Sequence, residues 1–173
     1  MRPAIDTDER HWPTMFTHAP LLAAAAANST GPILELGGGH GSTPLLHEIC
    51  RPTRRELWTY EDSWEWFAAE FSDLACEWHR LHRVPSRDMW RDMVYPNRSW
   101  GMVFIDHGNG DQRADSIRHF ADVAETWVVV HDSHPSGVEL YRYGPAFDLY
   151  RYRWTFDRYW PHSTVLSNHR PWA

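Results

Sequence analysis

Lysine is absent from this sequence of 173 residues, so all 17 basic side chains are arginines. Mechanisms that need a lysine base, a lysine Schiff base or a lysine that holds phosphate are therefore excluded. Cysteine is also scarce, and Cys50 and Cys76 both fall in segments that we predict to be helical. Two such cysteines cannot form a disulfide framework or a four-ligand zinc site. This cysteine usage favours an intracellular, cytoplasmic protein.

An excess of positive charge is missing as well, because the formal net charge is −6 at pH 7. Such a chain has no strong positive field for a polyphosphate backbone, so we do not expect nucleic acid as a partner. The most apolar early stretch, Ala19–Ala27, is short and contains Pro20. It has neither the length of a membrane span nor the basic start of a signal peptide. We therefore expect no membrane association.

The length and the composition, with 42% hydrophobic and 23% charged residues, suit one compact domain over residues 1–173. Short apolar runs alternate with segments of helical periodicity, and residues 1–30 are expected to form an N-terminal helical segment. We predict strands at 33–36, 55–60, 81–84, 101–105 and 127–130, followed by an antiparallel pair within 150–168. This order is typical of an α/β fold with a Rossmann-like, doubly wound, mainly parallel sheet in a three-layer α/β/α arrangement.

Helices are predicted between these strands from capping residues and apolar spacing. Thr43 can cap a helix that has Pro44 in its first turn. Aromatic and aliphatic residues recur at three- and four-residue steps over Trp64–Trp78, which indicates a second helix packed on the core. We expect a short helix or turn at 87–93 and a further helix at 112–124.

The most informative segment is a glycine-rich loop directly after the first strand. Glycines let the backbone turn sharply and let a ligand lie against it without an intervening Cβ. A dinucleotide-binding loop of the G-x-G-x-x-G type would need glycine or alanine where this chain has Ser42. Glu35, in the strand before the loop, would repel phosphates but suits a positively charged ligand. The loop glycines are Gly37, Gly38, Gly39 and Gly41.

With Glu35 ahead of it, the loop reads E-x-G-x-G-x-G and resembles the first motif of the class I S-adenosylmethionine-dependent methyltransferases. S-adenosylmethionine carries an ammonium and a sulfonium group and no phosphate, in agreement with a nearby acid. The resemblance implies that the loop binds this cofactor and that an acid after the second strand accepts hydrogen bonds from both ribose hydroxyls. Glu61 stands at that point, with Asp62 beside it.

The same resemblance implies further cofactor contacts. An acid after the third strand would bind the adenine amino group, which points to Asp88, with Met89 packing on the ring. Asp106, which ends the fourth strand, would face the methionine end of the cofactor. Considered singly, such acids have plainer interpretations: Glu35 can be an ion-pair partner and Glu61 can cap the following helix. Their joint order along the chain favours the cofactor.

Two interpretations of the chemistry stay open, and the first involves a metal. Asp106 and Asp132 would bind a divalent ion such as Mg²⁺, which would lower the pKa of a substrate hydroxyl. This arrangement resembles the catechol-type O-methyltransferases, which have carboxylates at these two strand ends and an asparagine beside the second. The chain departs from that pattern, because Ser133 replaces the asparagine and no lysine is present. His107 or His134 would then supply the missing ligand.

In the second interpretation a histidine is the general base, because imidazole titrates near neutral pH. His131 and His134 are the main candidates, with Asp132 orienting one of them. His107 lies in the same polar cluster and is a further candidate. Each histidine also has a plainer interpretation as a strand-end or loop residue that makes ordinary hydrogen bonds.

We therefore expect a methyltransferase that acts on a small molecule, at oxygen. The acceptor is expected to meet the N-terminal segment with His18 and the stretch 139–153 with Arg142, residues that could equally pack a homodimer interface. One alternative is an aminopropyltransferase-like enzyme, whose glycine loop is similar but whose fourth strand ends in an aspartate-rich segment. Another is a catalytically silent cofactor-binding module on the same fold.

Overall fold

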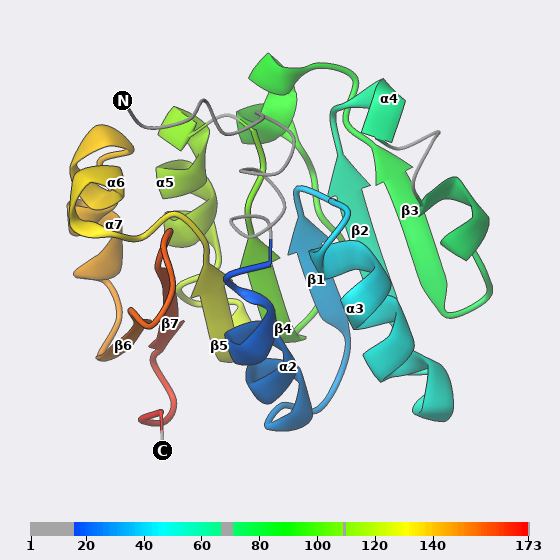
Figure 1. The fold of residues 1–173 in the computed structure, drawn as a ribbon, viewed down its shortest axis with the longest axis horizontal. Coiled ribbons are helices and arrows are strands. Elements are labelled where there is room, and N and C mark those ends of the chain that lie inside the picture. The colour runs from blue at the N-terminus through cyan, green and yellow to red at the C-terminus, as the bar shows by residue number, and fades with distance from the viewer. Residues whose placement is uncertain (1–15, 67–70, 109, 173) are drawn as a thin grey trace, which may run out of the picture.

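Seven strands form one sheet, drawn in Figure 1: β1 (Ile33–Leu36), β2 (Leu57–Glu61), β3 (His79–Arg83), β4 (Trp100–Ile105), β5 (Ala124–Val130), β6 (Tyr152–Phe156) and β7 (Ser163–Ser167). The structure is a computed structural model that describes residues 16–66, 71–108 and 110–172. The strand order is β3-β2-β1-β4-β5-β7-β6. The first five strands are parallel, and β7 pairs antiparallel with both β5 and β6. The expected doubly wound, mainly parallel sheet with an antiparallel C-terminal pair is confirmed.

The helices are α2 (Ala19–Ala27), α3 (Ser42–Cys50), α4 (Trp64–Trp66), α5 (Gly110–His119), α6 (Pro135–Leu140) and α7 (Gly144–Phe147), with short 3₁₀ helices η1 (Arg51–Thr53), η3 (Ser72–Leu74) and η4 (Arg87–Asp92). Two buried clusters lie on opposite faces of the sheet. One joins α2 and α3 to the sheet, and the other joins α5, α7 and η4 to it. This arrangement is the expected three-layer one, with α2 and α3 in front of the sheet in Figure 1.

Residues of the central strands alternate between these two layers. In β4, Met102 and Phe104 pack toward α2 and α3, whereas Val103 and Ile105 pack toward α5. Side chains of a strand point to opposite faces in turn, and both faces are covered here, so the whole strand is apolar. The same alternation decides on which face the polar residues after β4 and β5 lie. It is therefore the geometric basis of the site.

One predicted helix is shorter than expected. Within Trp64–Trp78 the described residues are helical up to Leu74, as α4, a π-helical Phe71 and the 3₁₀ helix η3, and residues 67–70 lie outside the described ones. The chain turns back instead, because the backbones of Cys76 and His79 exchange two hydrogen bonds just ahead of β3. Cys76 is therefore exposed and lies outside any helix, while Cys50 ends α3 as expected.

Several predicted boundaries shift by a few residues. The second strand begins at Leu57, two residues later than predicted, because the Arg55 guanidinium turns back to donate to the carbonyls of Ala26 and Gly31. The helix predicted at 112–124 spans Gly110–His119, and Ala124 already belongs to β5. The short helix predicted at 87–93 is present as η4.

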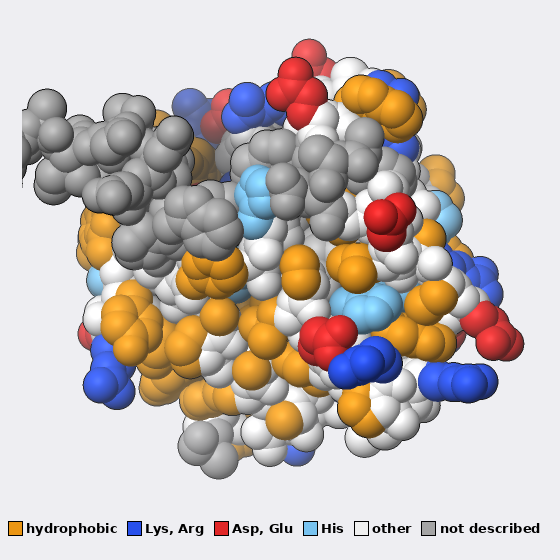
Figure 2. Space-filling model, turned by 45° about the vertical axis from the view of Figure 1, so that its right-hand side comes forward, with side chains coloured by type: hydrophobic (Ala, Val, Ile, Leu, Met, Phe, Trp, Pro, Cys, Tyr) orange, Lys and Arg blue, Asp and Glu red, His pale blue; other side chains and the backbone are white. Residues whose placement is uncertain are grey.

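The N-terminal segment contains a helix where the structure describes it, and the described side chains on the face drawn in Figure 2 show no concentration of basic charge. The described part of the expected N-terminal helical segment contains α2, and residues 1–15 lie outside the described ones. No helix within the described ranges is both long and apolar enough to cross a membrane. On the face drawn in Figure 2, basic side chains are scattered among acidic and apolar ones.

Candidate functional site

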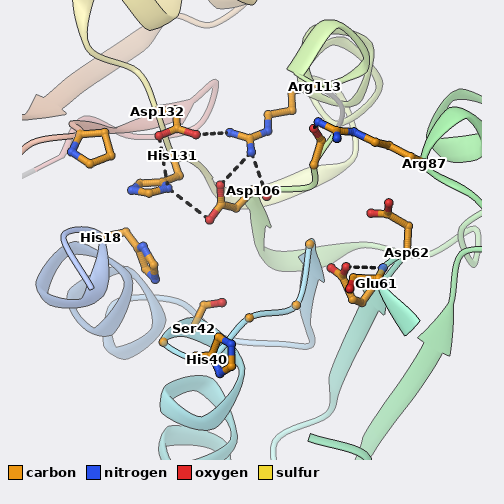
Figure 3. A pocket seen from close by; sticks show the side chains of 17 residues that line it. His18, His40, Ser42, Glu61, Asp62, Arg87, Asp106, Arg113, His131 and Asp132 are labelled. Carbon is orange, nitrogen blue, oxygen red and sulfur yellow. Dashed lines mark hydrogen bonds and ion pairs between the residues drawn. The ribbon is translucent and has the colours of Figure 1, made fainter. Parts of the chain in front are cut away.

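A cavity of about 480 Å³ opens where β1, β2, β4 and β5 end. Strand order reverses between β1 and β4, and ligands of open α/β sheets bind outside the carboxyl ends of strands at such a point. Figure 3 shows the lining in two groups. The glycine loop, Glu61 and Asp62 lie on the β1–β2 side, while Asp106, Arg113 and His131 lie on the β4–β5 side.

The glycine loop lies directly against the ends of the strands. Gly37 has φ of 96°, and a Cβ built there would lie 2.5 Å from the carbonyl carbon of Asp106. The backbone N–H groups of Gly37 and Gly38 both donate to the carbonyl of Tyr60, at 2.9 and 3.2 Å. Only glycine combines this backbone angle with so close an approach. The predicted loop glycines Gly37, Gly38, Gly39 and Gly41 all line the cavity.

The helix after the loop starts differently from the prediction. Its N-cap is Gly41 rather than Thr43. Thr43 is the second residue of the helix, fully buried, and its Oγ1 accepts a hydrogen bond from the N–H of Gly39 at 2.9 Å. The threonine therefore shapes the loop by fixing the orientation of one of its peptide groups.

Glu35 does not face the cavity. Its side chain is 0% exposed, on the α3 face of β1, and its Oε2 accepts a hydrogen bond from Thr59 Oγ1 at 2.7 Å. Burial raises the pKa of this carboxyl to about 7. Thr59 also contacts His79 Nε2 at 3.0 Å, and His79 Nδ1 lies 2.9 Å from His47 Nδ1. The predicted contact between Glu35 and a charged ligand is therefore corrected: this acid lies beneath the loop and is hydrogen-bonded to Thr59 of β2.

Glu61 and Asp62 line the cavity at the end of β2, where the sequence places the acid that would bind a ribose. Glu61 Oε1 accepts a hydrogen bond from the N–H of Ser63 at 2.6 Å, which orients the carboxyl. Burial raises the pKa of Glu61 to about 8. Asp62 accepts a hydrogen bond from Trp90 Nε1 at 3.1 Å. The position of Glu61 is compatible with a bound ribose, and that role stays a prediction.

Asp88 and Met89 are placed differently from the prediction. Both are exposed on η4 and neither lines the cavity. Instead, the backbone carbonyl of Asp88 accepts from Gln112 Nε2 at 3.0 Å. Arg87 reaches the cavity from the same helix, and its guanidinium donates to the carbonyl of Gly108. The predicted contact of Asp88 with an adenine is thus not supported by its location.

The buried Arg113 and the partly buried Asp106 and Asp132 form a network on the opposite side of the cavity (Figure 3). Arg113 Nη1 lies 2.8 Å from Asp132 Oδ2, and Nη2 lies 3.1 Å from Asp106 Oδ1. The same guanidinium donates to the backbone carbonyls of Asp106 and His107, at 3.0 and 2.5 Å. Asp132 adopts a left-handed backbone with φ of 54°, which is rare for a residue other than glycine.

This network does not fit the Mg²⁺ site expected at Asp106 and Asp132. The guanidinium of Arg113 already bridges the two carboxylates, so a divalent ion between them would meet a fixed positive charge. Ser133, in the position of the expected third ligand, is buried and accepts a hydrogen bond from Thr164 Oγ1 at 2.7 Å. The expectation that Asp106 and Asp132 form a magnesium site is therefore corrected.

His131 pairs mainly with Asp106. Its Nδ1 lies 3.2 Å from Asp106 Oδ2 and 3.7 Å from Asp132 Oδ1, while its Nε2 lies 3.1 Å from Thr17 Oγ1. Burial alone would lower the pKa of His131, but the charge of Asp106 raises it above the usual value. Burial alone would raise the pKa of Asp106, but the charges of His131 and Arg113 hold it well below its usual range. The residue that orients His131 is thus Asp106 more than Asp132.

His107 and His134 do not face the cavity, which corrects their predicted catalytic roles. His107 is 0% exposed, stacks on Trp90 with ring centroids 4.3 Å apart, and contacts Ser116 Oγ at 3.0 Å. Burial lowers its pKa well below the usual value. His134 precedes α6 and packs on Trp160, with ring centroids 3.8 Å apart. Strand alternation explains the result for His107, because it follows Asp106 and points to the α5 face.

His18 is the residue that the sequence did not single out for chemistry. It precedes α2, is 2% exposed, and lines the cavity beside His131. Among the described residues, neither of its ring nitrogens has a hydrogen-bond partner. Burial, with the charge of His131, lowers its pKa to about 3. Arg142, the other expected acceptor contact, is exposed and does not line the cavity.

Comparisons with known proteins agree with the fold. No family model matches the chain, and no curated protein matches its sequence. Among solved structures, the O-methyltransferase TomG from Streptomyces achromogenes in complex with SAM is 18% identical with a TM-score of 0.62, covering 86% of this chain and 80% of that one. The SAH-bound methyltransferase PaMTH1 from Podospora anserina is 17% identical with a TM-score of 0.59, covering 87% and 76%. Cofactor-bound Rv0187 from MTB is 15% identical with a TM-score of 0.60, covering 98% and 84%.

At these identities the similarity establishes the fold. The chain has the Rossmann-like fold of class I S-adenosylmethionine-dependent methyltransferases, as the glycine loop predicted. Fold alone does not determine activity, so the chemistry has to be argued from the cavity.

Proposed function

We propose that this protein is an S-adenosylmethionine-dependent methyltransferase that acts on a small-molecule acceptor, at oxygen. The observation that carries the proposal is the glycine loop itself. Its backbone forms one wall of the cavity at the topological switch point, and Glu61 stands at the end of the neighbouring strand. Solved methyltransferases with bound SAM or SAH share this fold.

The charges around the cavity suit a cationic nucleoside better than a phosphate. Asp62 lines the loop side and Asp106 lies across the cavity, whereas Arg113 is fully engaged with the carboxylates and carbonyls around it. Glu61 adds its charge only as the pH rises toward its pKa of about 8. A pyrophosphate in this position would meet carboxylates at short range. A sulfonium and an ammonium group would be attracted to them. This electrostatic setting supports S-adenosylmethionine as the cofactor.

The β4–β5 side would act on the acceptor. Methyl transfer is an in-line displacement, and for a hydroxyl acceptor the enzyme must hold the oxygen in line and take its proton. His131, oriented by Asp106 and Thr17, is the candidate for the proton-accepting group. The methyl group would pass from sulfur to oxygen, and the sulfonium would become a neutral thioether. A homodimer and a cytoplasmic location stay predictions.

A second function is favoured by one observation. Both Asp106 and Asp132 are ion-paired with Arg113, and both nitrogens of His131 have partners. A polar network that is already satisfied can be structural, in which case the chain would be a silent cofactor-binding module. Methyl transfer to a panel of phenolic and aliphatic hydroxyl acceptors distinguishes the two. The enzyme forms S-adenosylhomocysteine only with acceptor present, and His131→Ala slows it by about 10²-fold or more.

Cofactor binding itself is tested by calorimetry with S-adenosylmethionine and S-adenosylhomocysteine. We expect both to bind the wild type, and we expect Gly39→Arg to abolish binding because the new side chain fills the cavity beside the loop. Gly144→Arg is the matched control, since Gly144 lies on α7 with no atom within 4 Å of an added Cβ. Absence of heat with either compound, or undiminished affinity in Gly39→Arg, overturns the proposal.

A further inference from the structure

We propose that His18, Asp106 and His131 form a binding site for a divalent first-row transition-metal ion such as Zn²⁺ or Co²⁺. The three residues come from the start of α2, the end of β4 and the end of β5. One potential ligand atom from each lies within 4.8 Å of the other two. The set is distinct from the Asp106 and Asp132 pair that the sequence suggested, and its donors are mainly imidazoles.

The two imidazoles lie against each other beside the Asp106 carboxylate. His131 Nδ1 lies 3.2 Å from Asp106 Oδ2. The rings of His18 and His131 meet edge to face, with centroids 4.7 Å apart and an interplanar angle of 76°. Metal–ligand bonds of about 2.1 Å hold neighbouring ligand atoms roughly 3 to 4 Å apart. Small rotations of these side chains would bring all three donors onto one ion.

His18 supplies the independent observation for a ligand at this place. It is 2% exposed, it lines the cavity, and both ring nitrogens lack a hydrogen-bond partner within residues 16–66, 71–108 and 110–172. Buried polar atoms in proteins are nearly always paired, so such an orphaned imidazole needs an explanation. In Figure 3 its ring lies below His131 on the cavity side of α2. A bound ion would satisfy one of its nitrogens.

The surroundings of the donors match those of metal ligands. A ligating imidazole commonly hydrogen-bonds through its second nitrogen, and ligating carboxylates are hydrogen-bonded in turn. His131 Nε2 contacts Thr17 Oγ1 at 3.1 Å, which leaves Nδ1 for the ion. Asp106 directs Oδ1 to Arg113 at 3.1 Å and Oδ2 to His131. Arg113 therefore orients this carboxylate without occupying the oxygen that would bind the ion.

The ligand set selects the class of metal. Two imidazoles and one carboxylate suit zinc, iron, cobalt and nickel, whereas Mg²⁺ prefers oxygen donors and retains its water. Three protein donors also leave coordination positions open toward the cavity. An acceptor hydroxyl bound there would lose its proton more readily. This last role rests on the proposed methyl transfer, whereas the site itself does not.

His131 can activate the acceptor in one of two ways, as a general base or as a ligand of a bound metal ion, and the two exclude each other. With an ion bound, His131 is a ligand and does not take the acceptor's proton. Turnover that needs the ion supports the metal mode, and turnover that survives a chelator leaves His131 as the base. The metal site itself is tested by binding, which does not depend on any acceptor.

The test is a titration of the purified, chelator-treated full-length chain with Co²⁺, followed by its visible absorption, and then with Zn²⁺ as competitor. We expect one high-affinity equivalent per chain, displacement by Zn²⁺, and no displacement by millimolar Mg²⁺. His18→Leu is expected to weaken this equivalent by about tenfold or more, because it removes one of three ligands. His169→Ala, which removes an imidazole far from the cluster near the C-terminus, is expected to leave it unchanged.

Circular dichroism and thermal unfolding establish whether His18→Leu is folded, and Asp106→Asn serves as a second variant. A wild type that binds no Co²⁺ at one equivalent overturns the site, and so does a folded His18→Leu with wild-type affinity. Calorimetry with S-adenosylhomocysteine is run in parallel. If the protein binds S-adenosylhomocysteine but no metal, only the proposed metal site is refuted. If it binds metal but no S-adenosylhomocysteine, only the proposed function is refuted.

Discussion

The two sides of the cavity are built by different means. On the β1–β2 side the wall is backbone: glycines whose N–H groups and close contacts fix the loop against neighbouring strands. On the β4–β5 side it is a set of charged and aromatic side chains from α2, α5 and two strand ends, held by ion pairs. A backbone wall is specified by a few adjacent residues. A side-chain wall depends on residues far apart in the chain, such as Thr17 and His131, which are 114 positions apart.

This difference predicts how each side responds to substitution. On the backbone side, substituting a single glycine should lower stability through steric conflict, whatever the charge of the new side chain. On the charged side, substituting one residue of the network leaves its partners without a compensating charge. The stability lost should therefore depend on which other residues of the network are present.

The largest effect is expected for Gly37→Ala on the backbone side. The added Cβ would lie 2.5 Å from a backbone atom of Asp106, at a φ of 96° that alanine rarely adopts. We expect a loss of above about 4 kcal/mol in the free energy of unfolding, measured by urea denaturation. Gly144→Ala, with open space around its Cβ, should stay within about 1 kcal/mol of wild type. Equal stabilities of the two variants would contradict the steric argument.

Next in size is Arg113→Met on the charged side. The substitution keeps an unbranched apolar stem but leaves Asp106 and Asp132 without their shared cation. Because Arg113 is buried but the two carboxylates are partly exposed, its removal should cost about 3 kcal/mol, the lower end for buried ion pairs. Arg118→Met is the control, because Arg118 forms an exposed pair with Asp115 worth at most about 1 kcal/mol. If Arg113→Met were as stable as the control, the network would contribute little to the free energy of unfolding.

A smaller effect, which depends on pH, is expected for Glu35 beneath the loop. Its folded pKa of about 7 lies above the usual value near 4.5, so the folded state binds the proton more tightly than the unfolded state. Stability from this group is therefore present at pH 4 and is lost as the pH rises through about 7. The loss is on the order of 2 kcal/mol between pH 5 and pH 8.

Urea unfolding of wild type and Glu35→Gln over that range tests this sign. The stability of the variant relative to wild type should increase with pH, because glutamine does not ionise. Burial lowers the pKa of His79 to about 4 and raises that of Cys50 to about 11, so neither titrates in this range. Glu61, with a pKa of about 8, does titrate there, so the difference between variant and wild type is the quantity to compare. Glu48→Gln at an exposed position is the matched control. Parallel curves for wild type and Glu35→Gln would refute the assignment.

The smallest effect is expected for cofactor affinity at Glu61. Its pKa of about 8 means that the carboxylate forms mainly above that pH, where its hydrogen bonds to ribose hydroxyls would be strongest. Calorimetry with S-adenosylhomocysteine should show Glu61→Gln weaker than wild type by about tenfold at pH 9 and nearly equal at pH 6.5. Glu65→Gln, on the exposed α4, should match wild type at both pH values. A pH-independent difference would exclude titration of Glu61 as its cause.

The sequence predicted what depends on adjacent residues. Strand positions followed from apolar runs, and the loop followed from glycine spacing before a helix. The contacts of His18 and Arg113 could not be predicted, because they join segments brought together only by the folded sheet. His107 was misplaced for a different reason: period-two alternation was available in the sequence, and it would have put His107 and His131 on opposite faces. Similarly, aromatic spacing over 64–78 suggested a helix up to Trp78, whereas the backbone turn between Cys76 and His79 follows a helical part that ends at Leu74.

A hydrogen-bonded series runs from His47 through His79 and Thr59 to Glu35, beneath the glycine loop. His47 sits on α3 and is only partly buried, so it meets bulk water. The carboxyl of Glu35 is therefore linked to the outer surface of α3 by three successive side-chain contacts. A change in the protonation of Glu35 would alter the donors and acceptors along this series, on the face of the sheet opposite to α5.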